Sequence, residues 1–263
     1  MRIDGSTILL TGASSGIGEA LAPLLAERGA TMGIVARRAD RLEATLERCR
    51  AHTPGSRMWT ADLSDLDAAE ALVGTVWDEF GHVDCLINNA AMGKRKLVLD
   101  HTPEDLEQVL RTNFLSPVRM GTAMLRRMIG RGSGTLVNIA SGGGRFGIVH
   151  ESAYCAAKFA LSGWSEVAAM DLADEPVEIK LIQPGKIDTE IWIPPEGELP
   201  GIPGPSASAE ECALGIAEAL ETDGFEFMVP ADLRDHVAMK NADLDGWIEL
   251  MAAIGRDKLS GTP

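Results

Sequence analysis

The sequence predicts an α/β fold in which a single doubly wound parallel sheet of about seven strands carries helices on both faces. Short apolar runs alternate with longer amphipathic stretches along most of the chain. The short runs are almost continuously apolar, which is typical of strands that are buried on both faces of a parallel sheet. No internal repeat and no second-domain boundary is evident, so residues 1–263 are expected to form one domain.

The predicted strands are rich in β-branched and aliphatic residues and are too short to form helices of typical length. They cover residues 7–10, 31–36, 57–60, 85–87, 134–139, 177–182 and 225–229. The predicted helices lie between them and cover residues 17–28, 40–50, 67–80, 103–129, 153–172 and 209–220. Strands that alternate with helices in this way favour parallel pairing with helical crossovers.

The predicted helix 103–129 has a clear start and an internal break. Thr102 can cap its first turn, and Pro103 suits the first helical position, where no amide hydrogen is needed. Pro117 lies inside the stretch and cannot donate the hydrogen bond that a helix requires there. We therefore expect the helix to kink or divide near this proline.

Two segments near the C-terminus stand apart from the alternating pattern. Residues 191–205 contain five prolines and three glycines, so they cannot form an ordinary helix or strand. We predict that residues 190–206 form a lid over a binding site. Residues from about 231 to 263 form an acidic C-terminal extension, which is interpreted as a solvated surface or as a cap on the site.

Composition excludes several classes of protein. The net charge is −15, whereas nucleic-acid binding needs a basic surface, so no nucleic-acid partner is expected. No apolar run is long enough to span a bilayer, and the first residues run directly into a predicted strand, so we expect no membrane association and a cytoplasmic location. The four cysteines and five histidines show neither CxxC nor HExxH spacing, and no metal site is predicted.

A glycine-rich turn, TGASSGIG, follows the first predicted strand and precedes a predicted helix. Its three glycines allow a tight turn and a close approach of a pyrophosphate to the free amide groups at the helix N-terminus. The predicted cofactor contacts in this turn are Gly12, Ser14, Ser15, Gly16, Ile17 and Gly18. A simple loop is the alternative, but the strand–turn–helix context favours a dinucleotide site.

The spacing of this turn, G-x-x-x-G-x-G, resembles the TGxxxGxG signature of the short-chain dehydrogenase/reductase family. The resemblance covers roughly residues 5–230. It implies a Rossmann-like fold and an oxidoreductase that moves a hydride between a nicotinamide cofactor and the carbonyl or alcohol carbon of a small molecule. Members of the family commonly form homodimers or homotetramers, so it also implies a homo-oligomer.

The residues after the second predicted strand indicate which nicotinamide cofactor binds. In dinucleotide folds, an acid at this position bonds the adenosine ribose and selects NAD, whereas a nearby arginine accommodates the 2′-phosphate of NADP. Here Ala36 takes the place of the acid, and Arg37 and Arg38 follow it. A guanidinium can grip a phosphate with two parallel hydrogen bonds. NADP(H) is therefore the predicted cofactor, with NAD(H) as the alternative.

Further positions match motifs of the family. An aspartate that binds adenine in relatives corresponds to position 62, and the family's NNAG motif corresponds to residues 88–91, where Ala91 replaces the glycine. The PGxxxT motif corresponds to residues 184–189. By resemblance, these motifs add cofactor contacts at Asp62, Leu63, Asn89, Ala90, Pro184, Gly185, Ile187 and Thr189.

Tyr154 and Lys158 are predicted to form the catalytic pair. They lie four residues apart on a predicted helix and therefore share one face. A free phenol has a pKa of about 10, and a neighbouring ammonium is expected to lower that value. The phenol can then give a proton to a carbonyl oxygen or remove one from an alcohol. By resemblance, the same pair also contacts the cofactor.

Two further residues are predicted to be catalytic by their match to the family. Ser141 ends the fifth predicted strand, and its hydroxyl can stabilise negative charge that develops on the substrate oxygen. Asn113 resembles the asparagine that holds a water in a proton relay to the lysine. Asparagine is also a poor helix former, so a helix break at this position is a compatible interpretation.

Substrate contacts are predicted at Arg145, Phe146 and His150, in the loop before the catalytic helix, and at Trp192 in the lid. The apolar residues of the lid indicate a partly apolar substrate. Two alternatives stay open at this point. One is a regulator that binds NADP(H) without turnover, and the intact Tyr154 and Lys158 pair argues against it. The other is an alcohol dehydrogenase that prefers NAD.

Overall fold

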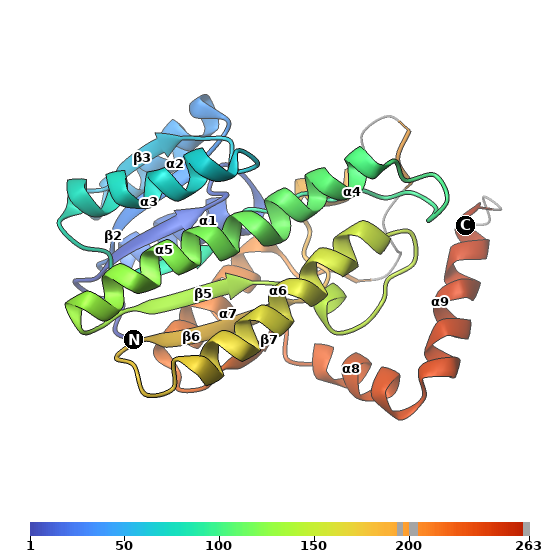
Figure 1. The fold of residues 1–263 in the computed structure, drawn as a ribbon. Helices are drawn as coiled ribbons and strands as arrows, with labels where there is room; N and C mark the ends of the chain where they lie inside the picture. Colours follow the sequence, from blue (N-terminus) through green and yellow to red (C-terminus); the bar gives the residue numbers. More distant parts are fainter. Residues whose placement is uncertain (194–196, 200–204, 260–263) are drawn as a thin grey trace.

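The computed structural model describes residues 1–193, 197–199 and 205–259. Its centre is one sheet with the strand order β3-β2-β1-β4-β5-β6-β7, and every neighbouring pair of strands is parallel. Helices cover both faces of this sheet (Figure 1). The predicted doubly wound α/β fold is thereby confirmed.

Each predicted strand is present, with bounds that differ from the prediction by at most two residues. The strands are β1 (Thr7–Thr11), β2 (Thr31–Ala36), β3 (Arg57–Thr60), β4 (Cys85–Asn88), β5 (Thr135–Ile139), β6 (Glu178–Pro184) and β7 (Glu226–Val229). All residues of β1, β4 and β5 are buried, as expected for central strands that are covered on both faces.

Two helical layers sandwich the sheet. One consists of α1 (Gly16–Glu27), α2 (Ala39–Arg50) and α7 (Ala209–Glu221), and α1 packs against both of the others. The other consists of α3 (Leu66–Phe80), α4 (Pro103–Leu110), α5 (Ser116–Arg131) and α6 (Ser152–Asp171). A separate cluster of buried apolar side chains fills the space between each layer and the sheet.

The predicted break in the helix 103–129 takes the form of a single π-helical turn, η1 (Arg111–Leu115), between α4 and α5. The Thr102 hydroxyl caps α4 as expected, and Asp105 completes a capping box. Pro117 lies in the first turn of α5, directly after the π-helical turn. The helix therefore widens ahead of the proline. It continues from α4 into α5 without a loop, as Figure 1 shows.

The C-terminal extension forms two helices, α8 (Leu233–Ala242) and α9 (Leu244–Leu259). They lie beyond the carboxyl ends of the strands (Figure 1). Trp247 packs on Phe146 with ring centroids 4.9 Å apart, and its indole donates a hydrogen bond of 3.2 Å to the Gly147 carbonyl oxygen. These contacts fasten the extension to the loop that follows β5.

Within the described parts of the chain, none of the helices combines the length and apolar character that a bilayer span requires. Within the same residues, no three His, Cys, Asp or Glu side chains are grouped so that they could hold a metal ion. All four cysteines are free thiols and are buried.

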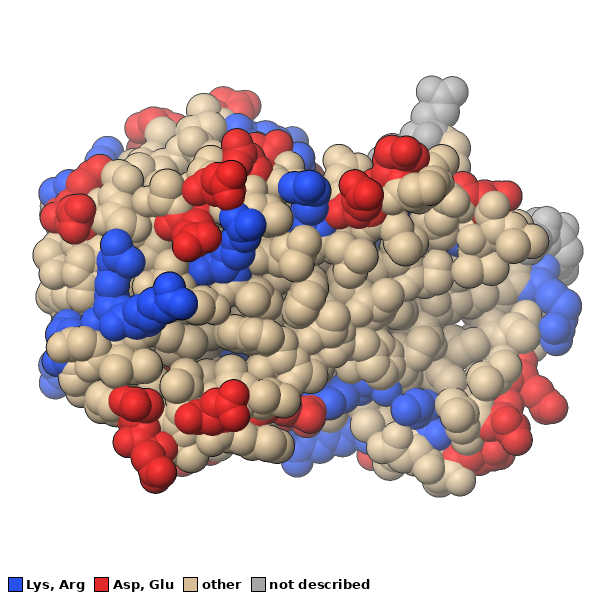
Figure 2. All heavy atoms as spheres, viewed as in Figure 1, with Lys and Arg blue, Asp and Glu red and all other residues tan. Residues whose placement is uncertain are grey.

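Charged side chains are distributed unevenly over the surface. Figure 2 shows a broad face over α4, α5 and α6 with few charges, flanked by acidic and basic groups. Large apolar side chains are exposed on these helices and the turn between them, namely Leu106, Leu115, Phe159, Val167 and Met170. In contrast, Met120 and Met124 on α5 are fully buried in the core.

Candidate active site

The predicted site residues gather at the carboxyl ends of the strands, around the point where the strand order reverses. β1 lies between β2 and β4, so the strand order runs outward from β1 in both directions, to β3 at one edge of the sheet and to β7 at the other. In doubly wound sheets, a crevice opens at such a reversal, and ligands bind there. The glycine-rich turn follows β1, and the serine and tyrosine lie near the end of β5.

The glycine-rich turn has the backbone that close ligand approach requires. Gly12 and Gly16 have φ values of +73° and +53°, a region that side-chain-bearing residues rarely adopt. A Cβ added at Gly18 would overlap the Gly12 carbonyl oxygen and lie 2.7 Å from the Asn89 amide nitrogen. Ser15 is the N-cap of α1, but its side chain makes no capping hydrogen bond. The turn therefore presents amide groups rather than side chains at the helix start.

Asparagines at the end of β4 bind this turn to the sheet. The Asn89 amide donates to the Thr11 carbonyl oxygen at 2.9 Å, and the Thr11 hydroxyl accepts from the backbone of Asn89 and Ala90 at 3.0 Å each. The Asn88 amide donates to Asn138 in β5 at 2.9 Å. These bonds hold the ends of three central strands in register around the crevice.

The residues predicted to select the cofactor lie beside the turn. Arg38 donates from Nε to the Ser14 hydroxyl at 3.3 Å, so it leans over the glycine-rich turn. Arg37 is exposed, and Leu63 is buried in the core. Hydrogen bonds from Ser64, together with the charge of Arg37, hold the pKa of Asp62 below its ordinary value.

The segment after β6 lies against the same turn. The Gly185 amide bonds the Val229 carbonyl oxygen at 2.8 Å, and Ile187 is buried. A Cβ added at Gly16 would lie 2.8 Å from Thr189 Cγ2, so the Thr189 side chain covers the turn. Of the PGxxxT positions predicted from the sequence, Thr189 is thus brought to the glycine-rich turn, whereas Gly185 lies against the end of β7.

Ser141 and Tyr154 come together through a tight turn. The 3₁₀ helix η2 (Gly142–Gly144) follows Ser141, whose hydroxyl accepts from the Gly143 amide at 3.1 Å. A Cβ at Gly143 would lie 3.4 Å from Tyr154 Cε1, an ordinary van der Waals distance, so this turn packs directly on α6. The Ser141 hydroxyl also acts on the Tyr154 phenol and lowers its pKa.

The pKa of Tyr154 differs from the expectation. Burial of the phenol raises its pKa above the ordinary value of 10.0, and the hydrogen bond with Ser141 opposes this shift only in part. The Lys158 Nζ lies 5.7 Å from the centre of the tyrosine ring and donates to the Ile139 carbonyl oxygen at 2.8 Å. In the polypeptide by itself, desolvation therefore outweighs the charge effect predicted from the sequence.

Lys158 is itself strongly affected by its surroundings. Its side chain is 2% exposed, and burial lowers its pKa from 10.5 to about 7. A lysine with this pKa changes its charge close to neutral pH. The lysine is thus poised to accept or release a proton in the range in which a general acid–base catalyst works best.

Asn113 lies in the π-helical turn η1 and is 1% exposed. Its amide oxygen accepts from the Met92 amide at 2.9 Å, and its amide nitrogen donates to the Met92 carbonyl oxygen at 2.8 Å. The side chain therefore holds the loop after β4 in place. Its part in a proton relay stays a prediction.

The predicted substrate contacts are placed differently from one another. The Arg145 guanidinium pairs with Glu226 at 2.6 Å and with Glu166 at 2.5 Å, so its charge is already compensated by β7 and α6. Phe146 is 7% exposed and packs among Leu233 and Trp247 of the C-terminal helices. Both side chains thus make contacts within the protein, and their part in substrate binding stays a prediction.

His150 and Trp192 remain near the surface of the crevice region. His150 has a positive φ of 67° and lies close to Gly255 of α9. Trp192 belongs to the 3₁₀ helix η3 (Glu190–Trp192), donates to the Ile187 carbonyl oxygen at 2.6 Å and is partly exposed. The rest of the predicted lid, residues 190–206, falls partly outside the described residues.

Some residues of the site were not predicted from the sequence. Gln183 is fully buried in β6 and accepts from the Ser141 amide at 3.0 Å, so it fixes the backbone of the serine. Arg95 is 2% exposed, bonds Glu151 at 3.1 Å and the Ile191 carbonyl oxygen, and thereby joins the start of α6 to η3. Arg95 lies in a run of three basic residues, 94–96, and this run was the available signal in the sequence.

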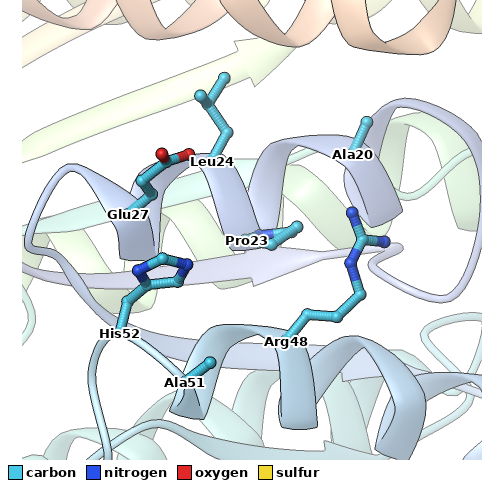
Figure 3. Close-up of a pocket in the computed structure, with 7 residues that line it drawn as sticks. All are labelled: Ala20, Pro23, Leu24, Glu27, Arg48, Ala51 and His52. Carbon is cyan, nitrogen blue, oxygen red and sulfur yellow. The ribbon is translucent and has the colours of Figure 1, made fainter.

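A surface cavity of about 390 Å³ lies elsewhere, between α1 and the end of α2. Figure 3 shows Glu27, Arg48 and His52 at its rim, with Pro23 and Leu24 from α1. None of its lining residues belongs to the Ser141 and Tyr154 region. Catalytic chemistry is therefore assigned to the crevice rather than to this cavity.

Comparison with known proteins agrees with this geometry. The family described as short chain dehydrogenase matches residues 6–196. The chain belongs to this family of oxidoreductases. Members of this family use small-molecule substrates and a nicotinamide cofactor.

Curated relatives carry a range of names. The chain is 36% identical over 191 residues to the uncharacterized oxidoreductase YxnA of Bacillus subtilis, a match that covers 72% of this chain and 54% of that protein. It is 32% identical over 191 residues to the 3-oxoacyl-[acyl-carrier-protein] reductase FabG of Vibrio harveyi, covering 73% of this chain and 77% of that protein.

Solved structures share the fold. A short-chain dehydrogenase/reductase from Burkholderia phymatum in complex with NAD superimposes with a TM-score of 0.85 at 22% identity, covering 93% of this chain and 96% of that one. A short chain dehydrogenase from Burkholderia cenocepacia in complex with NADP gives 0.79 at 24% identity, covering 95% and 99%. Neighbours of this fold therefore bind either cofactor.

Proposed function

We propose that this protein is an NADP(H)-dependent oxidoreductase that interconverts the carbonyl and alcohol forms of a partly apolar small molecule. The observation that carries the proposal is the meeting of Ser141 and Tyr154 at the turn η2, where the Gly143 amide bonds the Ser141 hydroxyl and the same glycine packs against the Tyr154 ring, with Lys158 buried one helical turn further along α6. This is the arrangement that an oxidoreductase needs to handle the proton on a reacting oxygen.

Each of the three residues has a distinct role in the proposed reaction. Tyr154 gives a proton to the carbonyl oxygen, or takes it from the alcohol in the reverse direction. Ser141 donates a hydrogen bond to the same oxygen and stabilises the negative charge that develops on it. Lys158, with a pKa of about 7, exchanges a proton near neutral pH and can restore the protonation of the tyrosine.

The cofactor proposed for the crevice is a nicotinamide dinucleotide, which would supply or accept the hydride when it is bound. The glycine-rich turn needs its glycines for tight packing, because an added Cβ at Gly12 or Gly18 meets backbone or Asn89 atoms within 3.0 Å. The residues proposed to hold the cofactor are those predicted from the sequence: Gly12, Ser14, Ser15, Gly16, Ile17, Gly18, Arg37, Arg38, Asp62, Leu63, Asn89, Ala90, Tyr154, Lys158, Pro184, Gly185, Ile187 and Thr189.

NADP(H) is proposed over NAD(H) because of the residues that follow β2. Ala36 offers no carboxylate to the ribose hydroxyls, and Arg37 and Arg38 can bind a 2′-phosphate. The position of Arg38 beside Ser14 supports this assignment, since it brings the guanidinium to the glycine-rich turn. An NAD-preferring enzyme is the alternative.

The decisive experiment follows nicotinamide absorbance with purified protein, NADPH or NADH, and a panel of aldehydes, ketones and 3-oxoacyl thioesters. Turnover with NADPH that is lost in Tyr154→Phe and strongly reduced in Ser141→Ala would support the proposal. Better turnover with NADH would refute the preference for NADP(H). Binding of both cofactors without turnover of any substrate would favour the non-enzymatic regulator.

The proposal extends to the state and location of the protein. We propose that residues 1–263 form a single domain and that the protein is a cytoplasmic homodimer or homotetramer. The weakly charged face over α4, α5 and α6 supports oligomer formation, because its exposed apolar side chains would be covered by a second copy (Figure 2). Light scattering coupled to size-exclusion chromatography measures the oligomeric state directly.

A further inference from the structure

A carboxylate from η3 lies between two arginines of the cofactor region. Glu190 Oε2 pairs with Arg38 Nη1 at 2.7 Å, and Glu190 Oε1 pairs with Arg41 Nη1. The other nitrogens of Arg38 bond the Ser14 hydroxyl and carbonyl oxygen at 3.3 Å. One acidic side chain thus links η3 to the start of α2 and, through Arg38, to the glycine-rich turn.

The backbone that carries Glu190 is held close to these arginines. The neighbouring Thr189 packs on Gly16 of the glycine-rich turn, where an added Cβ would lie 2.8 Å from Thr189 Cγ2. Trp192, at the other end of η3, is bound to the Ile187 carbonyl oxygen at 2.6 Å. The carboxylate is therefore presented to Arg38 and Arg41 by a fixed segment, and the contact does not depend on a long free loop.

A carboxylate and a phosphate offer a guanidinium the same kind of partner, an anion with oxygens placed for charge-assisted hydrogen bonds. We propose that Glu190 is a specificity-determining residue that competes with the cofactor 2′-phosphate for Arg38 and Arg41. This inference rests on the proposed function, which assigns Arg38 to that phosphate. It adds Arg41 to the residues proposed to bind the 2′-phosphate, and it assigns to Glu190 a role that weakens the binding of this phosphate.

The competition lowers affinity for NADP(H) without affecting NAD(H). A 2′-phosphate must either displace the carboxylate from the guanidinium groups or accept a like charge beside it, and NAD(H) meets neither cost. The three side chains are between 40% and 47% exposed, so the ion pairs are weak. Loss of the competing charge should therefore raise affinity for a 2′-phosphate by about threefold to tenfold.

The opposite role for Glu190 is also a physical possibility, and it predicts the opposite result. An acid that holds Arg38 and Arg41 in the geometry needed for a phosphate would pre-organise the site. Its removal would then weaken phosphate binding, because the free arginine side chains would have to be ordered by the ligand. The sign of the change in affinity separates the two roles.

The test is titration calorimetry with two fragments of the cofactor, adenosine 2′,5′-bisphosphate and adenosine 5′-monophosphate. Glu190→Gln keeps the size of the side chain and removes its charge. Glu43→Gln is the matched control, because Glu43 is an exposed acid on α2 two positions from Arg41. Binding of these fragments needs no turnover, so the readout does not depend on knowing the substrate.

We expect Glu190→Gln to bind the bisphosphate about threefold to tenfold more tightly than the wild-type protein, with the affinity for the monophosphate unchanged. Glu43→Gln should match the wild-type protein. An unchanged or weaker affinity of Glu190→Gln for the bisphosphate would overturn the proposal. So would an equal gain in Glu43→Gln, because the effect would then come from net charge.

Failure of the proposed cofactor preference gives a different result in the same experiment. The wild-type protein would then bind the monophosphate at least as tightly as the bisphosphate. If Glu190→Gln nevertheless gains affinity for the bisphosphate alone, competition by Glu190 is supported and itself explains the weak preference. If no such gain appears, the competition is refuted together with the preference.

Discussion

Replacement of Lys158 by methionine tests whether burial sets the charge of this residue. The side chain is 2% exposed, and its pKa falls from 10.5 to about 7 in the folded protein. In the unfolded chain, the lysine keeps its proton up to about pH 10.5. Between these two values, unfolding takes up a proton, so the stability of the wild-type protein rises with pH.

The size of the effect follows from the two pKa values. Between about pH 7 and about pH 9, the free energy of unfolding of the wild-type protein should increase by about 2 kcal/mol relative to Lys158→Met. The hydrogen bond of the lysine to the Ile139 carbonyl oxygen is also lost in the variant. That loss changes the difference in free energy of unfolding between the two proteins by a constant amount, so the slope of this difference with pH is unchanged.

Urea unfolding at intervals across this pH range measures the difference directly. Lys240→Met, which removes a lysine from the surface helix α8, reports the effect of losing one positive charge by itself. A wild-type minus Lys158→Met difference that stays flat from about pH 7 to about pH 9 would refute the reasoning. It would mean that Lys158 stays charged in the folded protein despite its burial.

Three further substitutions test other parts of the structure. Gly18→Ala should distort the glycine-rich turn by steric overlap and weaken binding of either nicotinamide cofactor by about tenfold or more, measured by NADPH and NADH fluorescence. Arg95→Leu should lower the free energy of unfolding by about 3 to 5 kcal/mol in urea, because the buried Glu151 loses this ion-pair partner. Trp247→Ala should lower the free energy of unfolding by about 3 to 5 kcal/mol. It should also raise KM more than it lowers kcat, because the loop 142–150 loses its support. An unchanged KM would contradict this role.

Much of the fold could be predicted because its signals are local. A short apolar run predicts the strand β1, and a glycine-rich turn followed by an amphipathic stretch predicts the helix α1. Each of these signals lies within a few neighbouring residues. The same holds for Tyr154 and Lys158, whose spacing on one helix places them on one face. The break in the helix 103–129 was expected near Pro117, but only the structure showed that it is a π-helical turn.

The sequence by itself therefore determined the order of the elements, the doubly wound sheet and the chemistry-bearing motifs. Tertiary structure decided which charges meet and which groups are dehydrated. It paired Arg145 with Glu226, placed Gln183 behind Ser141 and brought Glu190 to Arg38 from far along the chain. Helix and strand periodicity is a property of neighbouring residues, whereas ion pairing and pKa depend on burial and on partners distant in sequence, which arise only when the chain folds.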